Sequence, residues 1–599
     1  MIKKQLAGYC PKHISGDGIK TMKKIILYLL VLIIGAGGFL PAAVAEDETF
    51  IIVDYTQPMN RLIPGWEFPY ADEWFGRPAE EFNRELAKGS IGLTVSAFGN
   101  AEETGLDLQY ETYLKGAGFE DIHTFGYDIP KGSDTFAGVI GRKRIGETTV
   151  VAVAGRGGDY GKEWAGNLNL GEEERHAGFA QAAKIVEDEL TAYLAKYPAD
   201  GPVRLWVTGY SRSAAVGNLA AADWIASGEF EAVYAYLFAC PRTTTNPSEC
   251  PGIFNILCSQ DIVPQIPMQL YGFERNGKDL FLPSTETVTH FAELKKAASE
   301  IMQKMTGRDL IVNPEINVML RLLVSFLGRI FETRGDYVRQ FQQKMFASVS
   351  QMDESESALS LLPGMLSGLM SVKLPDGGKK LLNSLSLLST YLVMRAAGLG
   401  KDNDIQNGYW DPEDSSVVNM IREHLASTYI SWVFSDLKDE EVFHAAEKER
   451  ILFLKDCENL TVSCEGKTAW MLEKGIMKKA EEDSPGWART GSEMIMMILP
   501  VDGEYRITAE TKDGTFFAVE AIISPDITIC DTVRYYTASV SKDGSYELDA
   551  CFGDSLICAE NRETDSFECK QIKYNTEDLV TLATLGFSEN VMQSLNEAN

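Results

Sequence analysis

Between about residues 46 and 290, short and nearly continuous hydrophobic runs alternate with longer segments that resemble helices. Short apolar runs between turn residues are typical of buried strands, and longer amphipathic segments are typical of helices that cover a sheet. The expected strands are 148–154, 203–208, 232–239 and 254–257, and the expected helices are 177–196 and 214–226. The repeated order of strand, turn and helix predicts an α/β domain with a mainly parallel sheet.

The pattern changes twice further along the chain. Residues 291–410 are rich in Leu, Met and other helix formers, which predicts a large helical insertion, and residues 411–440 are expected to return to the core. In residues 441–575, Asp-Gly pairs separate β-type runs as hairpin turns do, so we expect a small β-rich domain. Residues 576–599 are expected to form a C-terminal helix.

Two stretches of the insertion, 316–331 and 361–369, are more apolar than a solvent-exposed helix would be. A movable cap with an apolar, Met-rich groove would suit long and flexible apolar ligands. The same residues could instead form the core of a helical subdomain, in which case the ligand could be small and soluble.

The first part of the chain has the order of a bacterial secretory signal peptide. Two lysines that follow Met22 precede an apolar run over 25–40 and then the small residues 43–45. We expect residues 1–45 to be a signal peptide cleaved before Glu46, with Met22 as an alternative start. A retained membrane anchor is the other interpretation, but the run is short for a membrane span. The expected location is therefore extracellular or at the cell surface.

Composition and charge narrow the choice of partners. With 45% hydrophobic and 24% charged residues, the chain has the composition of a soluble globular protein, and 599 residues require more than one core. The formal net charge is −30, and residues 1–45 carry six lysines and one aspartate, so removal of this segment would bring the charge to −35. Such a charge argues against nucleic acids and anionic membrane surfaces as partners.

The chain has ten cysteines, and they gather towards its end. Those in the last third are Cys457, Cys464, Cys530, Cys551, Cys558 and Cys569. Export would permit disulfides among them, although spacing does not define the pairs. A metal site is less favoured, because this region has no Cys-x-x-Cys pair and no nearby histidine.

The clearest chemical signal is the run Gly209-Tyr210-Ser211-Arg212-Ser213, between an expected strand and an expected helix. A serine in such a strand-to-helix turn is exposed on a strained backbone, and small neighbours leave room for the turn. The N-terminus of the following helix favours negative charge, so the Arg212 amide is expected to stabilise an oxyanion. We predict that Ser211 is a nucleophile.

A nucleophilic serine needs a histidine base and an acid that orients the histidine. Asp261 lies in the loop after the expected strand 254–257, at the edge of the sheet where active-site groups collect. His290, His424 and His444 follow it in the chain. His424 is favoured because it lies where the chain returns from the insertion, and His290 is the main alternative.

Residues from about 70 to 270 resemble the class 3, or fungal-type, lipase family of the α/β-hydrolases, in a secreted bacterial version. The motifs that carry the resemblance, in chain order, are 151–158, His176-Ala177-Gly178-Phe179, 207–211, Cys240-Pro241-Arg242 and the loop 261–267. The resemblance implies an α/β-hydrolase fold and places a second oxyanion amide at Gly158.

The chain also departs from the family pattern. Tyr210 replaces the usual histidine before the nucleophile, and Ser213 replaces the second glycine of the motif. The gap from Asp261 to His424 is wider than in compact members. The run from His424 to Tyr429 resembles a His and Tyr signature of bacterial relatives.

The resemblance implies hydrolysis of a carboxylic ester, with a lipid such as a triacylglycerol as the expected substrate. Ser211, Asp261 and His424 would form the triad, and no metal or cofactor is required. Two alternatives stay open from the sequence, a short-chain esterase and a non-catalytic surface protein that keeps the fold and binds a partner.

Overall fold

The computed structural model describes the larger part of the chain beyond the expected leader. The described residues are 49–57, 61–98, 109–130, 132, 135–157, 163–167, 169–171, 173–261, 263–267, 272–285, 287–311, 422–444, 448–455, 457–490, 494–511, 515–523, 530–540, 545–550 and 564–572. The expected leader, most of the expected insertion and the expected C-terminal helix lie outside these ranges.

Seven strands of the described residues form the central sheet, in the order β3-β4-β5-β6-β7-β8-β9. They are β3 (Glu120–Phe125), β4 (Gly138–Ile145), β5 (Thr148–Gly155), β6 (Val203–Tyr210), β7 (Ala232–Phe238), β8 (Ile253–Cys258) and β9 (Lys278–Leu282). The pairs from β5 to β9 are parallel, whereas β3 with β4 and β4 with β5 are antiparallel. The predicted mainly parallel α/β core is therefore confirmed.

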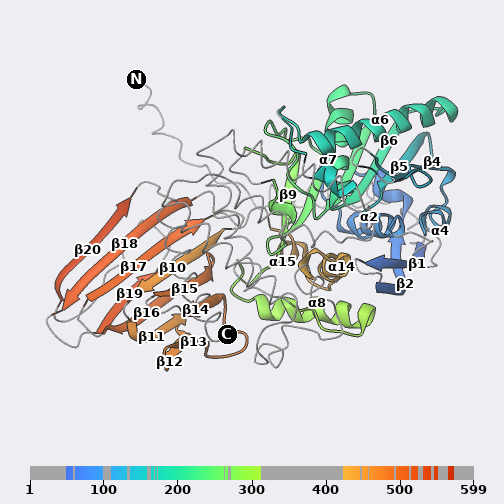
Figure 1. Ribbon diagram of the computed structural model, residues 1–599. Coiled ribbons are helices and arrows are strands. Elements are labelled where there is room, and N and C mark those ends of the chain that lie inside the picture. The colour runs from blue at the N-terminus through green and yellow to red at the C-terminus, as the bar shows by residue number, and fades with distance from the viewer. Residues whose placement is uncertain are drawn as a thin grey trace, which may run out of the picture. The chain divides into compact units, whose positions relative to one another are not determined.

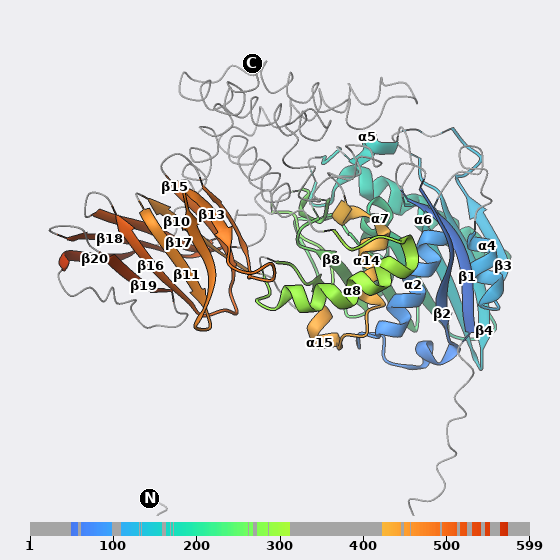
Figure 2. The ribbon, with the colours of Figure 1, turned by 90° about the horizontal axis from the view of Figure 1, so that it is seen from below.

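Helices cover both faces of this sheet (Figures 1 and 2). The described helices are α2 (Arg84–Ser96), α4 (Tyr110–Gly116), α5 (Trp164–Asn167), α6 (Ala177–Lys196), α7 (Arg212–Ser227), α8 (Phe291–Thr306), α14 (Ala426–Val433) and α15 (Asp439–Val442), with 3-10 turns η1 (Asp72–Gly76), η3 (Val263–Gln265) and η6 (Arg422–His424). The helix expected at 177–196 coincides with α6, and α7 begins two residues before the start expected at 214.

The two faces of the sheet belong to two hydrophobic clusters. Val151 and Leu205 pack with residues of α6 and α7, whereas Ala152 and Trp206 pack with residues of α2. Successive side chains of a strand point to opposite faces of the sheet. A strand with helices on both sides is buried on both faces, so its sequence is an unbroken apolar run.

The α2 side also carries an N-terminal hairpin of β1 (Thr49–Gln57) and β2 (Arg61–Tyr70) together with α8 and α14. Phe291 of α8 and Trp432 of α14 lie with their ring centroids 5.9 Å apart. The short helix α14 is buried along its whole length. This position matters because η6, which carries His424, lies directly before α14.

The expected β-rich region is present, and its described strands form two antiparallel sheets (Figure 1). The first sheet has β14 (Trp487–Thr490), β15 (Met494–Pro500), β10 (Glu449–Lys455), β17 (Thr515–Ile523), β18 (Cys530–Val540) and β20 (Thr564–Ile572), and the second has β13 (Ile476–Lys479), β12 (Lys467–Glu473), β11 (Cys457–Cys464), β16 (Tyr505–Thr511) and β19 (Ser545–Ala550). Side chains from both sheets share one hydrophobic cluster, as in a β-sandwich.

Among the described helices, none combines the length and the apolar character that crossing a membrane requires.

Candidate active site

Ser211 stands alone between the end of β6 and the start of α7. Its backbone has φ 57° and ψ −123°, and a positive φ is costly for a residue with a side chain. The Ser211 amide donates to Phe238 O at 2.9 Å, so the neighbouring strand β7 holds this turn. Gly209 is required here, because a Cβ at that position would lie 2.5 Å from the backbone carbon of Ser213. The sequence therefore folds into a sharp strand-to-helix turn with Ser211 at its apex.

Ser213, the departure from the family motif, fits the turn through two contacts. Its Oγ accepts from the Tyr210 amide at 2.8 Å and donates to Tyr210 O at 2.9 Å. Gly155 makes room for it, since a Cβ on Gly155 would lie 2.7 Å from the Ser213 Cβ. The serine thus replaces glycine with its hydroxyl satisfied by backbone groups.

The three residues predicted as a triad lie in one hydrogen-bonded line. His424 Nε2 is 3.0 Å from Ser211 Oγ, and His424 Nδ1 is 2.7 Å from Asp261 Oδ2. The Asp261 side chain is fully buried, whereas 12% of the His424 side chain is exposed. With a proton on Nδ1 donated to the carboxylate, Nε2 is the acceptor for the serine hydroxyl.

Asp261 follows β8, and each of its carboxylate oxygens has a partner other than His424. Oδ1 accepts from the Val263 amide at 2.9 Å, and Oδ2 accepts from the Tyr429 hydroxyl at 2.8 Å. The Tyr429 oxygen in turn accepts from the Cys258 amide at 3.2 Å. Burial and the charge of Asp261 raise the pKa of Tyr429 well above its ordinary value, so Tyr429 remains a donor. In the sequence Tyr429 was only part of a short signature, and the structure gives it this contact.

His424 lies in η6, and side chains from two distant segments donate hydrogen bonds to carbonyl groups of the segment that contains η6 and α14. The Tyr210 hydroxyl donates to His424 O at 2.8 Å. At the far end of α14, the Arg84 guanidinium donates to Val433 O at 2.9 Å and to Ser435 O at 2.6 Å. A cation suits the carbonyl groups at a helix C-terminus. Sequence reasoning missed Arg84, since nothing local marks an arginine that bonds about 350 residues away.

The other candidate histidines lie in different surroundings. His290 is the N-cap of α8, and its side chain makes no capping hydrogen bond. His444 forms a backbone bridge with Phe281 of the edge strand β9. The residue that the structure brings to Ser211 and Asp261 is His424.

Of the two predicted oxyanion donors, one can be placed. Arg212 is the first residue of α7, so its amide lies at the helix N-terminus, where the helix dipole favours negative charge. Gly158 lies outside the described residues.

His176 of the predicted motif is fully buried and caps α6, where its Nδ1 accepts from the Phe179 amide at 3.4 Å. Burial lowers the pKa of His176 to about 3, which keeps the imidazole neutral.

Residues 156–271 match the family model of the class 3 lipases. The match supports a lipase-type hydrolase. The matched region includes Ser211 and Asp261 but ends before His424. The assignment of His424 to the site therefore rests on the tertiary structure and not on the family model. The lipase-like core has the α/β-hydrolase fold.

No curated protein matches the chain. Similar solved structures include the native Rhizomucor miehei lipase propeptide complex, at 18% identity and a TM-score of 0.26, which covers 41% of this chain and 78% of that one. Lipase II from Rhizopus niveus (19%, TM-score 0.26) and the mono- and diacylglycerol lipase from Aspergillus oryzae (20%, TM-score 0.25) each cover 34% of this chain and 81% of their own.

Proposed function

We propose that this protein is a secreted serine hydrolase that cleaves carboxylic esters of lipids, with Ser211 as its nucleophile. The observation that carries the proposal is the continuous line from Ser211 Oγ through His424 to Asp261, with contacts of 3.0 and 2.7 Å. Serine, histidine and acid in this geometry are the elements of nucleophilic acyl transfer.

In the proposed reaction, Ser211 Oγ attacks the ester carbonyl carbon while its proton passes to His424 Nε2. Asp261 stabilises the imidazolium that forms. The tetrahedral intermediate places negative charge on the former carbonyl oxygen, which the Arg212 amide at the start of α7 would stabilise, with Gly158 as the second donor implied by the family resemblance.

The intermediate collapses when His424 Nε2 gives its proton to the leaving alkoxide, which departs as an alcohol and leaves an acyl-serine. Water then attacks the acyl carbon while His424 Nε2 takes one of its protons. His424 gives this proton to Ser211 Oγ as the bond from Oγ to the acyl carbon breaks, which releases the carboxylic acid and free Ser211. The cycle needs no metal and no cofactor.

Labelling with a fluorophosphonate probe tests the nucleophile, because these probes phosphonylate activated serines. The parent should label and Ser211→Ala should not. Ser227→Ala is the matched control, since Ser227 lies at the other end of α7 with its Oγ bonded to Trp224 O. Folded parent protein without Ser211-dependent labelling would refute the proposal.

The lipid part of the proposal rests on the class 3 lipase match. Hydrolysis of p-nitrophenyl esters with increasing acyl length, and of emulsified triacylglycerol, tests it. Preference for long chains supports a lipase, and activity confined to short soluble esters would identify a short-chain esterase.

Secretion is tested by expression in a bacterial host and N-terminal sequencing of exported protein. We expect the mature chain to begin at Glu46, and protein that stays inside the cell with its first residues intact would contradict a cleaved leader.

A further inference from the structure

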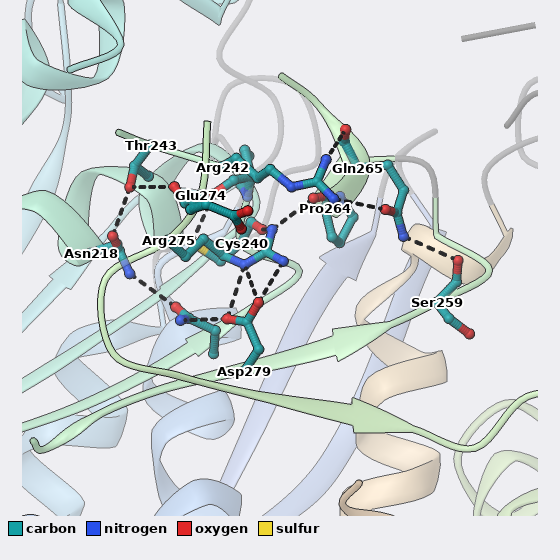
Figure 3. A network of polar contacts seen from close by, with 12 residues as sticks. Asn218, Cys240, Arg242, Thr243, Ser259, Pro264, Gln265, Glu274, Arg275 and Asp279 are labelled. Carbon is teal, nitrogen blue, oxygen red and sulfur yellow. Dashed lines mark hydrogen bonds and ion pairs between the residues drawn. The ribbon is translucent and has the colours of Figure 1, made fainter. Parts of the chain in front are cut away.

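Two buried arginines donate hydrogen bonds to three carbonyl groups of the loop that carries Asp261. Figure 3 shows both arginines beside Pro264 and Gln265. Arg242 Nη1 donates to Gln265 O at 2.6 Å and to Pro267 O at 3.2 Å. Arg275 Nη1 donates to Pro264 O at 2.7 Å. Buried carbonyl groups require donors, and Pro264 and Pro267 have no amides of their own to help close the loop.

Arg275 also ties this loop to the neighbouring strand. The same Nη1 donates to Cys240 O at 3.2 Å, in the turn after β7. Its Nε and Nη2 hold the carboxylate of Asp279 on β9, at 3.0 and 2.7 Å. The guanidinium therefore joins the segments after β7 and β8 to β9, and only 7% of Arg275 is exposed.

Asp279 continues the network towards the nucleophile. Its Oδ1 accepts from Asn255 Nδ2 at 2.9 Å, and Asn255 lies on β8, the strand that leads to Asp261. Asn255 Oδ1 accepts from Asn218 Nδ2 at 3.1 Å, and Asn218 lies on α7, two turns beyond Ser211. A chain of hydrogen bonds, buried at Asn218 and partly exposed at Asp279, thus connects the helix of the nucleophile to the loop of the acid (Figure 3).

We propose that the Arg275 and Asp279 pair is a positioning unit for Asp261, which sets the carboxylate at hydrogen-bond distance from His424. This inference rests on the proposed function. A network of largely buried hydrogen bonds favours a single geometry, and a shift of about 1 Å at a reacting group can cost about 100-fold in rate.

Arg275→Lys is the sharpest variant, because it keeps the charge. One ammonium group cannot reproduce the planar fork that holds the Asp279 carboxylate and two carbonyl groups together. We expect kcat on a soluble p-nitrophenyl ester to fall about 10- to 100-fold with KM within about twofold, because the displaced Asp261 impairs the chemical step and not substrate binding.

Arg142→Lys is the matched control. Arg142 also joins an aspartate and carbonyl groups, with Nε 2.7 Å from Asp121 Oδ2 and Nη1 3.2 Å from Pro198 O. It lies on β4, which β5, β6 and β7 separate from β8. We expect Arg142→Lys to change thermal stability only, with kcat unchanged.

A double-mutant cycle with Asp261→Asn separates positioning from a general structural role. If Arg275 acts through Asp261, Arg275→Lys lowers kcat in the parent but has little further effect once Asp261 is changed. Equal effects in both backgrounds, or kcat of folded Arg275→Lys within about twofold of the parent, would overturn the proposal.

Should Arg275→Lys fail to fold, Asp279→Asn asks the same question with a milder change, and additivity with Asp261→Asn would again overturn the proposal. If the parent protein shows no Ser211-dependent labelling, the proposed function itself is refuted. If the parent labels normally and the Arg275 and Asp279 variants keep its kcat, only the positioning unit is refuted.

Discussion

The Tyr429 hydroxyl donates to Asp261 Oδ2, the same oxygen that accepts from His424 Nδ1, at distances of 2.8 and 2.7 Å. Tyr429 lies on α14, the helix that directly follows His424, so one short segment supplies both partners of this oxygen. Two donors on one oxygen fix the position of the carboxylate and define the direction from which the imidazole approaches.

We predict that Tyr429→Phe lowers kcat about tenfold, which corresponds to about 1.4 kcal/mol and is near the lower end for a hydrogen bond to a charged group. KM should change little, since Tyr429 is buried behind the acid. Steady-state kinetics on a soluble ester measures both constants. Tyr113→Phe is the control, because it removes a buried hydroxyl that bonds Gly89 O at 2.7 Å, away from this site. A full kcat in folded Tyr429→Phe would contradict the assigned contact.

We predict that His424→Ala lowers turnover by about 1,000-fold or more, because it removes the imidazole that lies 3.0 Å from Ser211 Oγ and takes its proton in the proposed reaction. His290→Ala should stay within about twofold of the parent, since His290 is the N-cap of α8 without a capping side-chain bond. Both the hydrolysis rate and the rate of fluorophosphonate labelling should be far lower in His424→Ala than in His290→Ala and the parent. Equal activity of His424→Ala and the parent would mean that another base serves Ser211.

We predict that Gly209→Ala abolishes activity and destabilises the core. Its Cβ would lie 2.5 Å from both the carbon and the oxygen of the Ser213 carbonyl group, and these backbone atoms cannot move without distorting the turn. Gly217→Ala, within α7, is the control, because its nearest obstacle is a Leu237 methyl group at 3.0 Å, which can shift. Thermal unfolding and labelling of Ser211 measure the difference, and similar behaviour of the two variants would argue against the strained turn.

The buried His176 predicts a pH dependence of stability. Its pKa is about 3 in the folded protein, lowered first by burial, against an unfolded value of about 6.5. Between these values the unfolded chain binds a proton that the folded protein does not, so stability falls as the pH drops from about 6.5 towards 3, by up to about 1.4 kcal/mol per pH unit.

Chemical unfolding at a series of pH values measures this slope. His176→Gln should flatten it, whereas His123→Gln, at a half-buried position paired with Glu189, serves as the control. An unchanged slope in His176→Gln would show that other groups cause the acid sensitivity.

The sequence by itself determined the parts of this protein that local rules encode. Unbroken apolar runs predicted the strands around Ser211, and the small residues near it predicted a tight turn between strand and helix. The position of Asp261 followed from the same rule, because a loop after a parallel strand lies at the edge of the sheet where the other loops meet. Each of these inferences needs only neighbouring residues and the periodicity of a single element.

The tertiary structure alone decided which histidine lies beside Ser211 and what holds it there. His424 is 213 residues from Ser211 and 163 from Asp261, and three histidines follow Asp261 in the chain. Arg84 and Arg275 have no local signature, and the short signature that includes Tyr429 does not show what its hydroxyl contacts. Each of the three makes its contacts by packing against a distant segment. Hydrogen-bond geometry between such segments depends on how whole helices and strands pack, and periodicity along the chain does not contain that information.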